Sequence, residues 1–213
     1  MSTSNVPDWP RDVCSTGQRE AAVSVDGKDR REIMLVRVKV EKIEHIKTIK
    51  LQHFCAGLAH HGGQLYITTN TALHVYDMAD GKGMKMYSDG RKVGINVNKC
   101  AVSPDGCRIY ITSTTHNQLI TLNKDGTMLS TLTHPELQCP ITPHVTAQGH
   151  VFVTCYDRGT VVQVTENNNH QTVTTLAGEN NGLTKPVSLC FNSNYSLVVG
   201  LLNNNNIVEL KLK

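Results

Sequence analysis

The apolar residues of this chain fall in short runs separated by turn residues, and no stretch shows the spacing of an amphipathic helix. The clearest segment is 100–132, where runs at 100–103, 108–112, 119–122 and 128–132 follow one another. Pro104-Asp105-Gly106, Thr115-His116-Asn117 and Lys124-Asp125-Gly126 separate these runs. Such residues supply the fixed or positive φ of tight turns. The segment is therefore predicted to form four short antiparallel strands.

The same order of runs and turns is found five times along the chain, with copies that begin near Val13, Gly57, Cys100, His144 and Leu189. Aligning the end of the second run places Ser24, Thr68, Thr112, Thr154 and Gly200 at equivalent positions, 42–46 residues apart. Four strands at a period near 44 are typical of propeller blades. We expect an all-β fold, a β-propeller of four-stranded antiparallel blades with five blades. A six-bladed ring with one blade missing, a sandwich and an elongated β array remain as alternatives.

The repeat sets the expected domain organisation. Residues 1–213 are predicted to form a single domain, with blades at about 13–51, 54–88, 99–133, 143–177 and 187–213. The last copy ends after its third strand, which would leave an open sheet edge. We expect a strand from residues 1–12, around Thr3–Val6, to close that blade.

The third copy carries a family resemblance. Cys100-Ala101-Val102-Ser103-Pro104-Asp105-Gly106, then Ile109-Tyr110-Ile111-Thr112 and Leu122-Asn123-Lys124-Asp125-Gly126, resembles the NHL repeat. The wider chain is similar in style to the C-terminal propellers of invertebrate tripartite-motif proteins. This resemblance implies a platform that docks protein or RNA, and a minority of related propellers are enzymes.

Composition adds the charge distribution and the expected compartment. Hydrophobic residues make up 39% and charged residues 18%, which is ordinary globular composition. Seven cysteines without a CxxC pair, no visible signal peptide and no long apolar run favour a cytoplasmic protein without a membrane partner. Residues 1–100 contain 15 Lys/Arg and 11 Asp/Glu, whereas residues 101–213 contain 6 and 7. The small positive excess therefore lies in the first half.

The loops of the predicted blades divide between two faces, because successive antiparallel strands reverse direction. One face collects the turns between second and third strands and the longer links between blades. Recognition residues tend to lie on such loops. The predicted binding residues on this face are basic or histidine: Lys28, Arg30, Arg31, Arg91, Lys92, Lys99, His116, His134, Arg158 and Lys185.

Candidate chemical groups are few. His60 and His61 are adjacent on an extended segment and point in opposite directions, so they are read as turn residues rather than metal ligands. His144 aligns with small residues of the innermost strands and is expected to line a channel. Cys14, Cys55, Cys100 and Cys190 begin innermost strands and are read as small buried apolar residues. We expect no catalytic residues, metal or cofactor.

These observations favour a non-catalytic binding or scaffold propeller that docks an acidic protein or peptide on its basic long-loop face. It is expected to be a monomer if the ring closes. A single-stranded RNA-binding module of NHL type is the main alternative, although the predicted loops hold few aromatic residues for stacking. A metal-dependent hydrolase or lyase that uses the channel is a further alternative.

Overall fold

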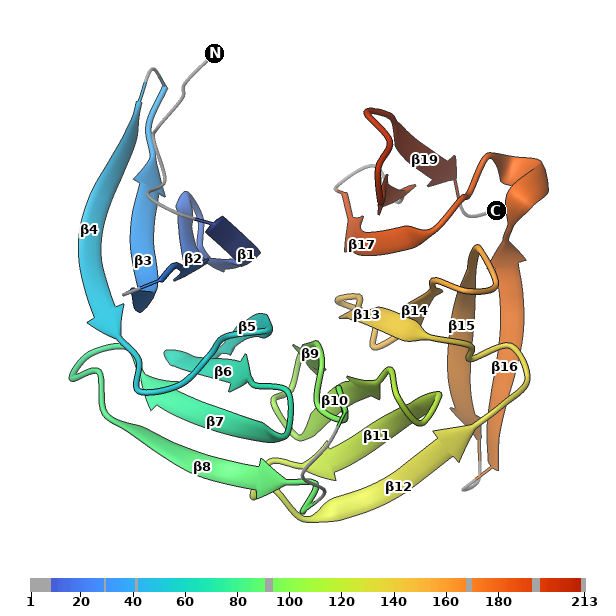
Figure 1. The fold of residues 1–213 in the computed structure, drawn as a ribbon, viewed down its shortest axis with the longest axis horizontal. Coiled ribbons are helices and arrows are strands. Elements are labelled where there is room, and N and C mark those ends of the chain that lie inside the picture. The colour runs from blue at the N-terminus through green and yellow to red at the C-terminus, as the bar shows by residue number, and fades with distance from the viewer. Residues whose placement is uncertain are drawn as a thin grey trace. The chain divides into compact units, whose positions relative to one another are not determined.

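Each sequence repeat folds into one antiparallel sheet whose strands follow the order of the chain (Figure 1). The structure, a computed structural model, describes residues 9–28, 30–40, 42–90, 94–167, 170–192 and 196–211. In these residues four sheets have four strands and the last has three. The fold is all-β, with the five antiparallel blades of a β-propeller, which confirms the fold class expected from the repeat.

The blades are numbered in chain order and their strands have the following bounds. Blade 1 contains β1 (Trp9–Gly17), β2 (Glu20–Asp26), β3 (Arg31–Val38) and β4 (Ile43–Lys50); blade 2 contains β5 (Gly57–His61), β6 (Gln64–Thr68), β7 (Ala72–Asp77) and β8 (Gly83–Ser88). Blade 3 contains β9 (Cys100–Val102), β10 (Arg108–Ser113), β11 (Gln118–Asn123) and β12 (Met128–Thr133). Blade 4 contains β13 (Pro140–Val145), β14 (Val151–Cys155), β15 (Thr160–Asn167) and β16 (His170–Ala177), and blade 5 contains β17 (Pro186–Phe191), β18 (Ser196–Leu201) and β19 (Ile207–Lys211).

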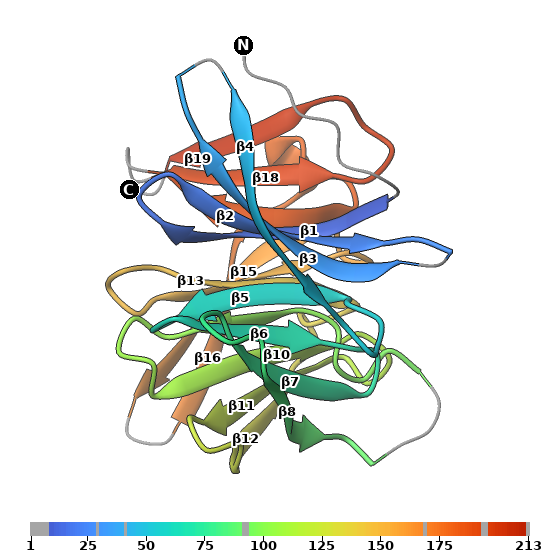
Figure 2. The same cartoon turned by 90° about the vertical axis from the view of Figure 1, so that its left-hand side faces the viewer.

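The blades belong to two compact units. Blades 1 and 2 lie in unit 1, Met1–Val93, and blades 3 to 5 lie in unit 2, Gly94–Lys213. In unit 1, β1 to β4 pair in sequence order, and in Figure 2 the long strand β4 crosses in front of the other strands of its sheet. A single 3₁₀ turn, Glu179–Asn181, is the helical element of the described residues, and none of their helices is long and apolar enough to cross a bilayer.

The two middle strands of a blade are buried on both faces. In β10 the successive residues Ile109, Tyr110 and Ile111 are all buried, whereas the outer strand β12 alternates between exposed and half-buried positions. A strand covered on both faces requires a continuous apolar run, and a strand covered on one face requires alternation. This difference explains why the second and third runs of each repeat are the most apolar.

The core lies between neighbouring blades within each unit. In unit 1 a cluster joins blades 1 and 2 through residues that include Ile33, Ile49, Leu65 and Ile67. In unit 2 one cluster joins blades 3 and 4, and another joins blades 4 and 5. Burying a side chain of this size stabilises the fold by about 1.5–3 kcal/mol, so the apolar faces of the sheets hold adjacent blades together.

The first strand starts earlier than the sequence suggested. Residues 9–12 belong to β1, where Trp9 pairs with Asp26 and Pro10 with Val25. The proposed closing strand around Thr3–Val6 lies outside the described residues, so it stays a prediction. Proline is tolerated near the start of a strand, which is why the Trp9-Pro10 pair does not prevent β1 from forming.

Candidate docking surface

Each blade has two ends that differ in their connections. We call the end that holds the turn between the second and third strands, together with the link to the next blade, the long-loop end. The opposite end is the short-turn end. Eight of the ten predicted binding residues belong to long-loop ends, and the other two, Arg91 and Lys92, lie outside the described residues.

Three of the predicted residues lie at the long-loop end of blade 1. Lys28 and Arg30 are exposed in the β2–β3 turn, and Arg31 is the exposed first residue of β3. The turn is closed by a hydrogen bond from Gly27 N to Arg30 O at 2.8 Å, and Leu51 N donates to Arg31 O at 2.7 Å. The backbone that carries these side chains is therefore fixed at both sides of the turn.

An aromatic group that the sequence analysis missed lies at the same end of blade 1. The pairing of Trp9 with Asp26 places Trp9 beside the last residue of β2, next to the β2–β3 turn. The side chain of Trp9 remains 69% exposed. Its neighbour Arg11 has the guanidinium carbon 5.8 Å from the centre of the Trp9 ring and 5.5 Å from that of Phe54. Cations favour such positions over aromatic faces, so Arg11 connects the two rings.

Polar contacts hold this group in place. Arg11 Nη2 lies 3.4 Å from Asp26 Oδ2. Asp12 Oδ2 accepts a hydrogen bond of 2.8 Å from Leu58 N, which ties β1 to the start of blade 2 beyond Phe54. We call Trp9, Arg11, Lys28, Arg30, Arg31 and Phe54 the aromatic–basic patch. Four of its residues are cationic, and Asp12, Asp26, Asp29 and Glu32 lie beside them in the sequence. Arg11 is paired with Asp26, so the exposed cations of the patch are Lys28, Arg30 and Arg31 at the β2–β3 turn.

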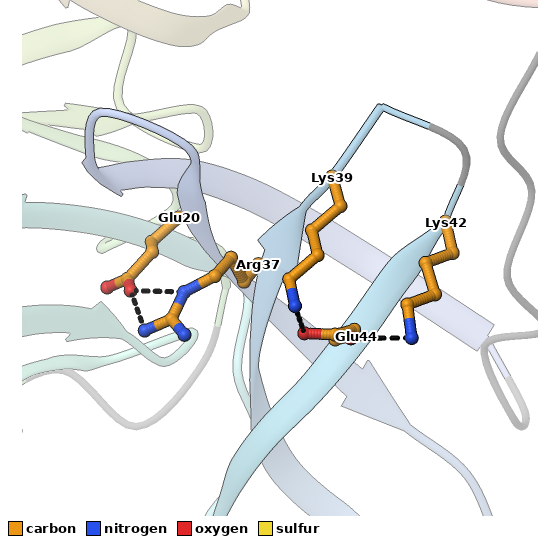
Figure 3. A network of polar contacts seen from close by, with 5 residues as sticks. All are labelled: Glu20, Arg37, Lys39, Lys42 and Glu44. Carbon is orange, nitrogen blue, oxygen red and sulfur yellow. Dashed lines mark hydrogen bonds and ion pairs between the residues drawn. The ribbon is translucent and has the colours of Figure 1, made fainter.

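The short-turn end of blade 1 has a different arrangement of charge (Figure 3). There the Arg37 guanidinium contacts Glu20 at 2.6 Å, and the ammonium groups of Lys39 and Lys42 contact Glu44 at 2.8 and 2.7 Å. The hydrogen bond from Lys39, followed by that from Lys42, lowers the pKa of Glu44 to about 2. Arg37, Lys39 and Lys42 are therefore used in local ion pairs.

The predicted residues of unit 2 also make local contacts. Arg158 Nη2 lies 2.5 Å from Glu136 Oε1, and this hydrogen bond is the main reason that the pKa of Glu136 is lowered. His134 Nδ1 accepts a hydrogen bond from Glu136 N at 3.2 Å, and His116 Nδ1 lies 3.3 Å from Ser113 Oγ. Lys185 Nζ lies 5.8 Å from the Tyr156 ring centre.

The long loops of unit 2 are balanced in charge. Lys99, the fifth predicted residue of unit 2, lies in the link before β9. Together these loops hold three basic residues, Lys99, Arg158 and Lys185, and three acidic residues, Glu136, Asp157 and Glu179. The positive excess of the long-loop ends among the described residues therefore comes from blade 1.

The histidines and cysteines considered as candidates for chemistry lie in or near the strands of the blades. His60 and His61 lie in β5 and His144 in β13, where burial lowers the pKa of the His144 imidazole. Burial is the main cause that raises the pKa of Cys14 to about 12, followed by the charges of Asp12 and Cys55. A thiol with such a pKa is protonated at neutral pH and is a poor nucleophile. Within the ranges that the structure describes, three or more His, Cys, Asp or Glu side chains do not gather where they could hold a metal ion.

Comparison with known proteins supports the fold. No family model and no curated protein matches the sequence. A chain from the crystal structure of a nidogen/laminin complex aligns with a TM-score of 0.76 and 14% identity, covering 95% of this chain and 76% of that one. An auxiliary nutrient binding protein from Bacteroides ovatus aligns with a TM-score of 0.77 and 16% identity, covering 98% of this chain and 60% of that one. A streptogramin B lyase structure aligns with a TM-score of 0.65 and 12% identity, covering 99% of this chain and 85% of that one. At these identities the likeness shows the fold alone.

Proposed function

We propose that this chain is a non-catalytic docking propeller whose aromatic–basic patch binds an acidic peptide segment of a partner protein. The observation that carries the proposal is Trp9, which is 69% exposed although Arg11 and the β1–β2 pairing fix its surroundings. Trp and Arg are the residues most enriched among those that contribute most to binding at protein interfaces. An exposed apolar side chain that the fold holds in place loses little conformational entropy on binding.

The charge of the patch favours an acidic partner. Lys28, Arg30 and Arg31 are exposed at one turn of one blade, so their field attracts carboxylates during the approach of the partner. The Trp9 and Phe54 rings supply apolar contact area beside these cations. A matching segment would therefore carry Asp or Glu residues next to an aromatic or aliphatic residue.

The structural neighbours are compatible with this proposal. One of them belongs to a nidogen/laminin complex and another is described as a nutrient binding protein. Binding is therefore a use to which similar folds are put, although the streptogramin B lyase shows that the fold also supports an enzyme. The patch, rather than these likenesses, is the basis for assigning a docking role to this chain.

Display of random peptides against the purified protein tests the proposal. We expect enrichment of acidic sequences with an apolar residue, and we expect Trp9→Ala to weaken the affinity for a selected peptide by about tenfold or more. Ile207→Ala is the matched control, because Ile207 is 71% exposed on blade 5 in unit 2. The proposal would be wrong if both variants bound the peptide equally well.

An RNA-binding experiment with the same protein tests the alternative function. Filter binding with a random single-stranded RNA of about 30 nucleotides would show a steep fall in affinity with salt if phosphates dominate. RNA binding that is lost in Trp9→Ala, with no peptide enriched, would replace the peptide proposal with an RNA-binding function.

A further inference from the structure

A groove separates blades 3 and 4 in unit 2 at their short-turn ends. Its deeper part is a hollow of about 350 Å³ lined by side chains that include Arg108, Tyr110, His150, Glu166 and Gln171, with Val151 and Val164 among the lining residues. Glu166 and Gln171 also line a second hollow, beside Leu129, Ser130 and Leu132 of β12. The two hollows therefore form one continuous groove.

Polar contacts connect the two walls of this groove. Arg108 Nη1 of blade 3 lies 2.6 Å from Glu166 Oε2 of blade 4, and Gln171 Nε2 of blade 4 donates to Ser130 Oγ of blade 3 at 3.2 Å. The side chains of Arg108 and Glu166 are 43% and 31% exposed, so a ligand in the groove can reach both. The ion pair leaves the groove without net charge, which disfavours a charged ligand.

The polar side chains of the groove are suited to hydrogen bonds with the hydroxyl groups of a ligand. Guanidinium, carboxylate, amide and imidazole groups can each exchange hydrogen bonds with a hydroxyl. The phenol of Tyr110 is protonated at neutral pH and can donate, and burial raises its pKa further. Leu129, which is 53% exposed, and Leu132 add apolar area, whereas Val151 and Val164 are each 5% exposed. The groove thus offers dense polar groups beside apolar surface.

The groove suits a small molecule better than an extended peptide. In the first hollow, strands β10, β14 and β15 are each paired on both sides within their sheets, so they have no free edge to which a peptide strand could be added. The outer strands β12 and β16 each have a free edge, but the hydrogen bond from Gln171 to Ser130 joins them across the groove. Ligand pockets span about 300–1,000 Å³, and the deeper hollow lies at the low end of that range. A small molecule is therefore the better fit.

From these observations we infer that the groove between blades 3 and 4 binds a small, uncharged, polyhydroxylated molecule of the size of a mono- or disaccharide. Arg108, Glu166 and Gln171 supply the hydrogen bonds, and the side chains of Leu129 and Leu132 contact the C–H faces of the ring. This site is separate from the aromatic–basic patch, and variants of the patch are expected to leave it unchanged.

Saturation-transfer NMR with the purified chain tests this inference. The neutral probes are methyl glucoside, methyl mannoside, maltose and cellobiose at about 10 mM, which would reveal a Kd of about 1 mM. Glucuronate and inorganic phosphate are the charged probes. We expect signal from at least one neutral probe and none from the charged probes.

Two variants locate the binding. Gln171→Leu keeps the size of the side chain and removes its amide, so the affinity for the neutral probe should fall about tenfold. Gln118→Leu is the matched control, because Gln118 also donates to a hydroxyl, that of Thr133 at 3.3 Å, but at the long-loop end of blade 3. Glu166→Gln leaves the Arg108 charge without its carboxylate, and this variant should bind glucuronate.

The possible results separate clearly. Binding of a neutral probe that is lost in Gln171→Leu and kept in Gln118→Leu supports the inference, as does the gain of glucuronate binding in Glu166→Gln. If no neutral probe binds, if glucuronate binds the unmodified chain as well as the neutral probe does, or if both glutamine variants behave alike, the inference is overturned. Circular dichroism of each variant confirms that the β-sheet fold is retained.

Discussion

At the scale of single residues, a small group in blade 2 shows how burial controls protonation. His53 Nδ1 donates to the Phe54 carbonyl at 3.0 Å, and its Nε2 lies 2.9 Å from the Tyr76 hydroxyl. The ring of His74 lies over that of His53, with 4.0 Å between the centroids. Desolvation first, then the nearby His53 and Lys85, lowers the pKa of His74 to about 4.

This pKa predicts a pH-dependent stability. Because the ordinary pKa of histidine is 6.5, the unfolded chain binds a proton at His74 more readily than the folded chain does between pH 6.5 and 4. The stabilisation is therefore complete above about pH 6.5 and is lost as the pH falls toward 4. Its size is on the order of 1–2 kcal/mol after allowance for the exposed part of the ring. Urea unfolding of His74→Gln should show a weaker fall in stability across this range.

His170→Gln is the control for this experiment, because His170 is exposed on β16. Its unfolding free energy should follow the pH dependence of the unmodified chain. Identical pH profiles for His74→Gln and the unmodified chain would contradict the assignment to His74.

The residues of the docking surface could be predicted only in part. Lys28, Arg30 and Arg31 follow from the turn signal Asp-Gly after an apolar run. Trp9 was missed because Pro10 and Asp12 interrupt the apolar pattern, so the first strand was expected to begin at Val13. The alternation of Trp9, Arg11 and Val13 on one side of an extended segment was the available signal. The contact of Arg11 with Phe54 joins residues 43 positions apart, which no local pattern reveals.

At the scale of elements, a hydroxyl residue at the end of the second strand joins neighbouring strands and blades. Thr112 is fully buried; its Oγ1 accepts from Lys99 N at 3.2 Å and donates to Ile141 O of blade 4 at 2.7 Å. In blade 4, Thr154 Oγ1 accepts from Thr142 N at 3.0 Å. In blade 1, Ser24 Oγ donates to Asp12 O at 3.3 Å. The aligned positions of the repeat therefore fix the first strand of the blade.

Thr112→Val is expected to destabilise the protein by about 1–3 kcal/mol. Valine has nearly the same shape, but it leaves the Lys99 N–H and the Ile141 carbonyl without this partner. Thermal or urea unfolding measures the loss. Thr133→Val, at an exposed position at the end of β12, is the control and should change the stability by less than about 0.5 kcal/mol. Equal effects at the two positions would show that burial of the hydroxyl is not the cause.

The strands themselves were predictable where turn chemistry and apolar runs agree. In blade 3 the runs 108–112 and 119–122 correspond to β10 and β11, which extend one residue further at one or both ends. Ser103 and Asp105 explain why the first turn was so clear. The Ser103 hydroxyl donates to Asp105 Oδ1 at 2.5 Å, and Cys107 N donates to the same oxygen at 3.0 Å. A turn held by its own side chains leaves a signal in the sequence.

At the scale of the whole molecule, the uneven charge of the sequence has a structural counterpart. The positive excess of residues 1–100 includes the aromatic–basic patch of blade 1, whereas the long loops of unit 2 carry equal numbers of basic and acidic residues. The sequence located this excess in the first half. It could not show that Arg158 is paired with Glu136, because the two residues come from different loops.

This distribution predicts which charges control association. In Arg30→Glu combined with Arg31→Glu, the rate of association with a selected acidic peptide should fall about ten- to a hundredfold at low salt, and it should depend less on salt. Lys99→Glu combined with Lys185→Glu, two changes in unit 2, should have a smaller effect. Biolayer interferometry over a range of salt concentrations measures both rates. If the association rate fell more in the Lys99→Glu, Lys185→Glu variant, the peptide would instead contact unit 2.

Blade 5 differs from the other blades at the aligned position, where Gly200 takes the place of a hydroxyl residue. Gly200 pairs with Ser188 of β17, and a Cβ at position 200 would collide with the Ser188 hydroxyl oxygen. The space is thus filled from the opposite strand, so we expect the residues at positions 188 and 200 to change together. Homologues that regain threonine at position 200 should carry alanine or glycine at 188, and such paired replacements would be a historical record of this contact.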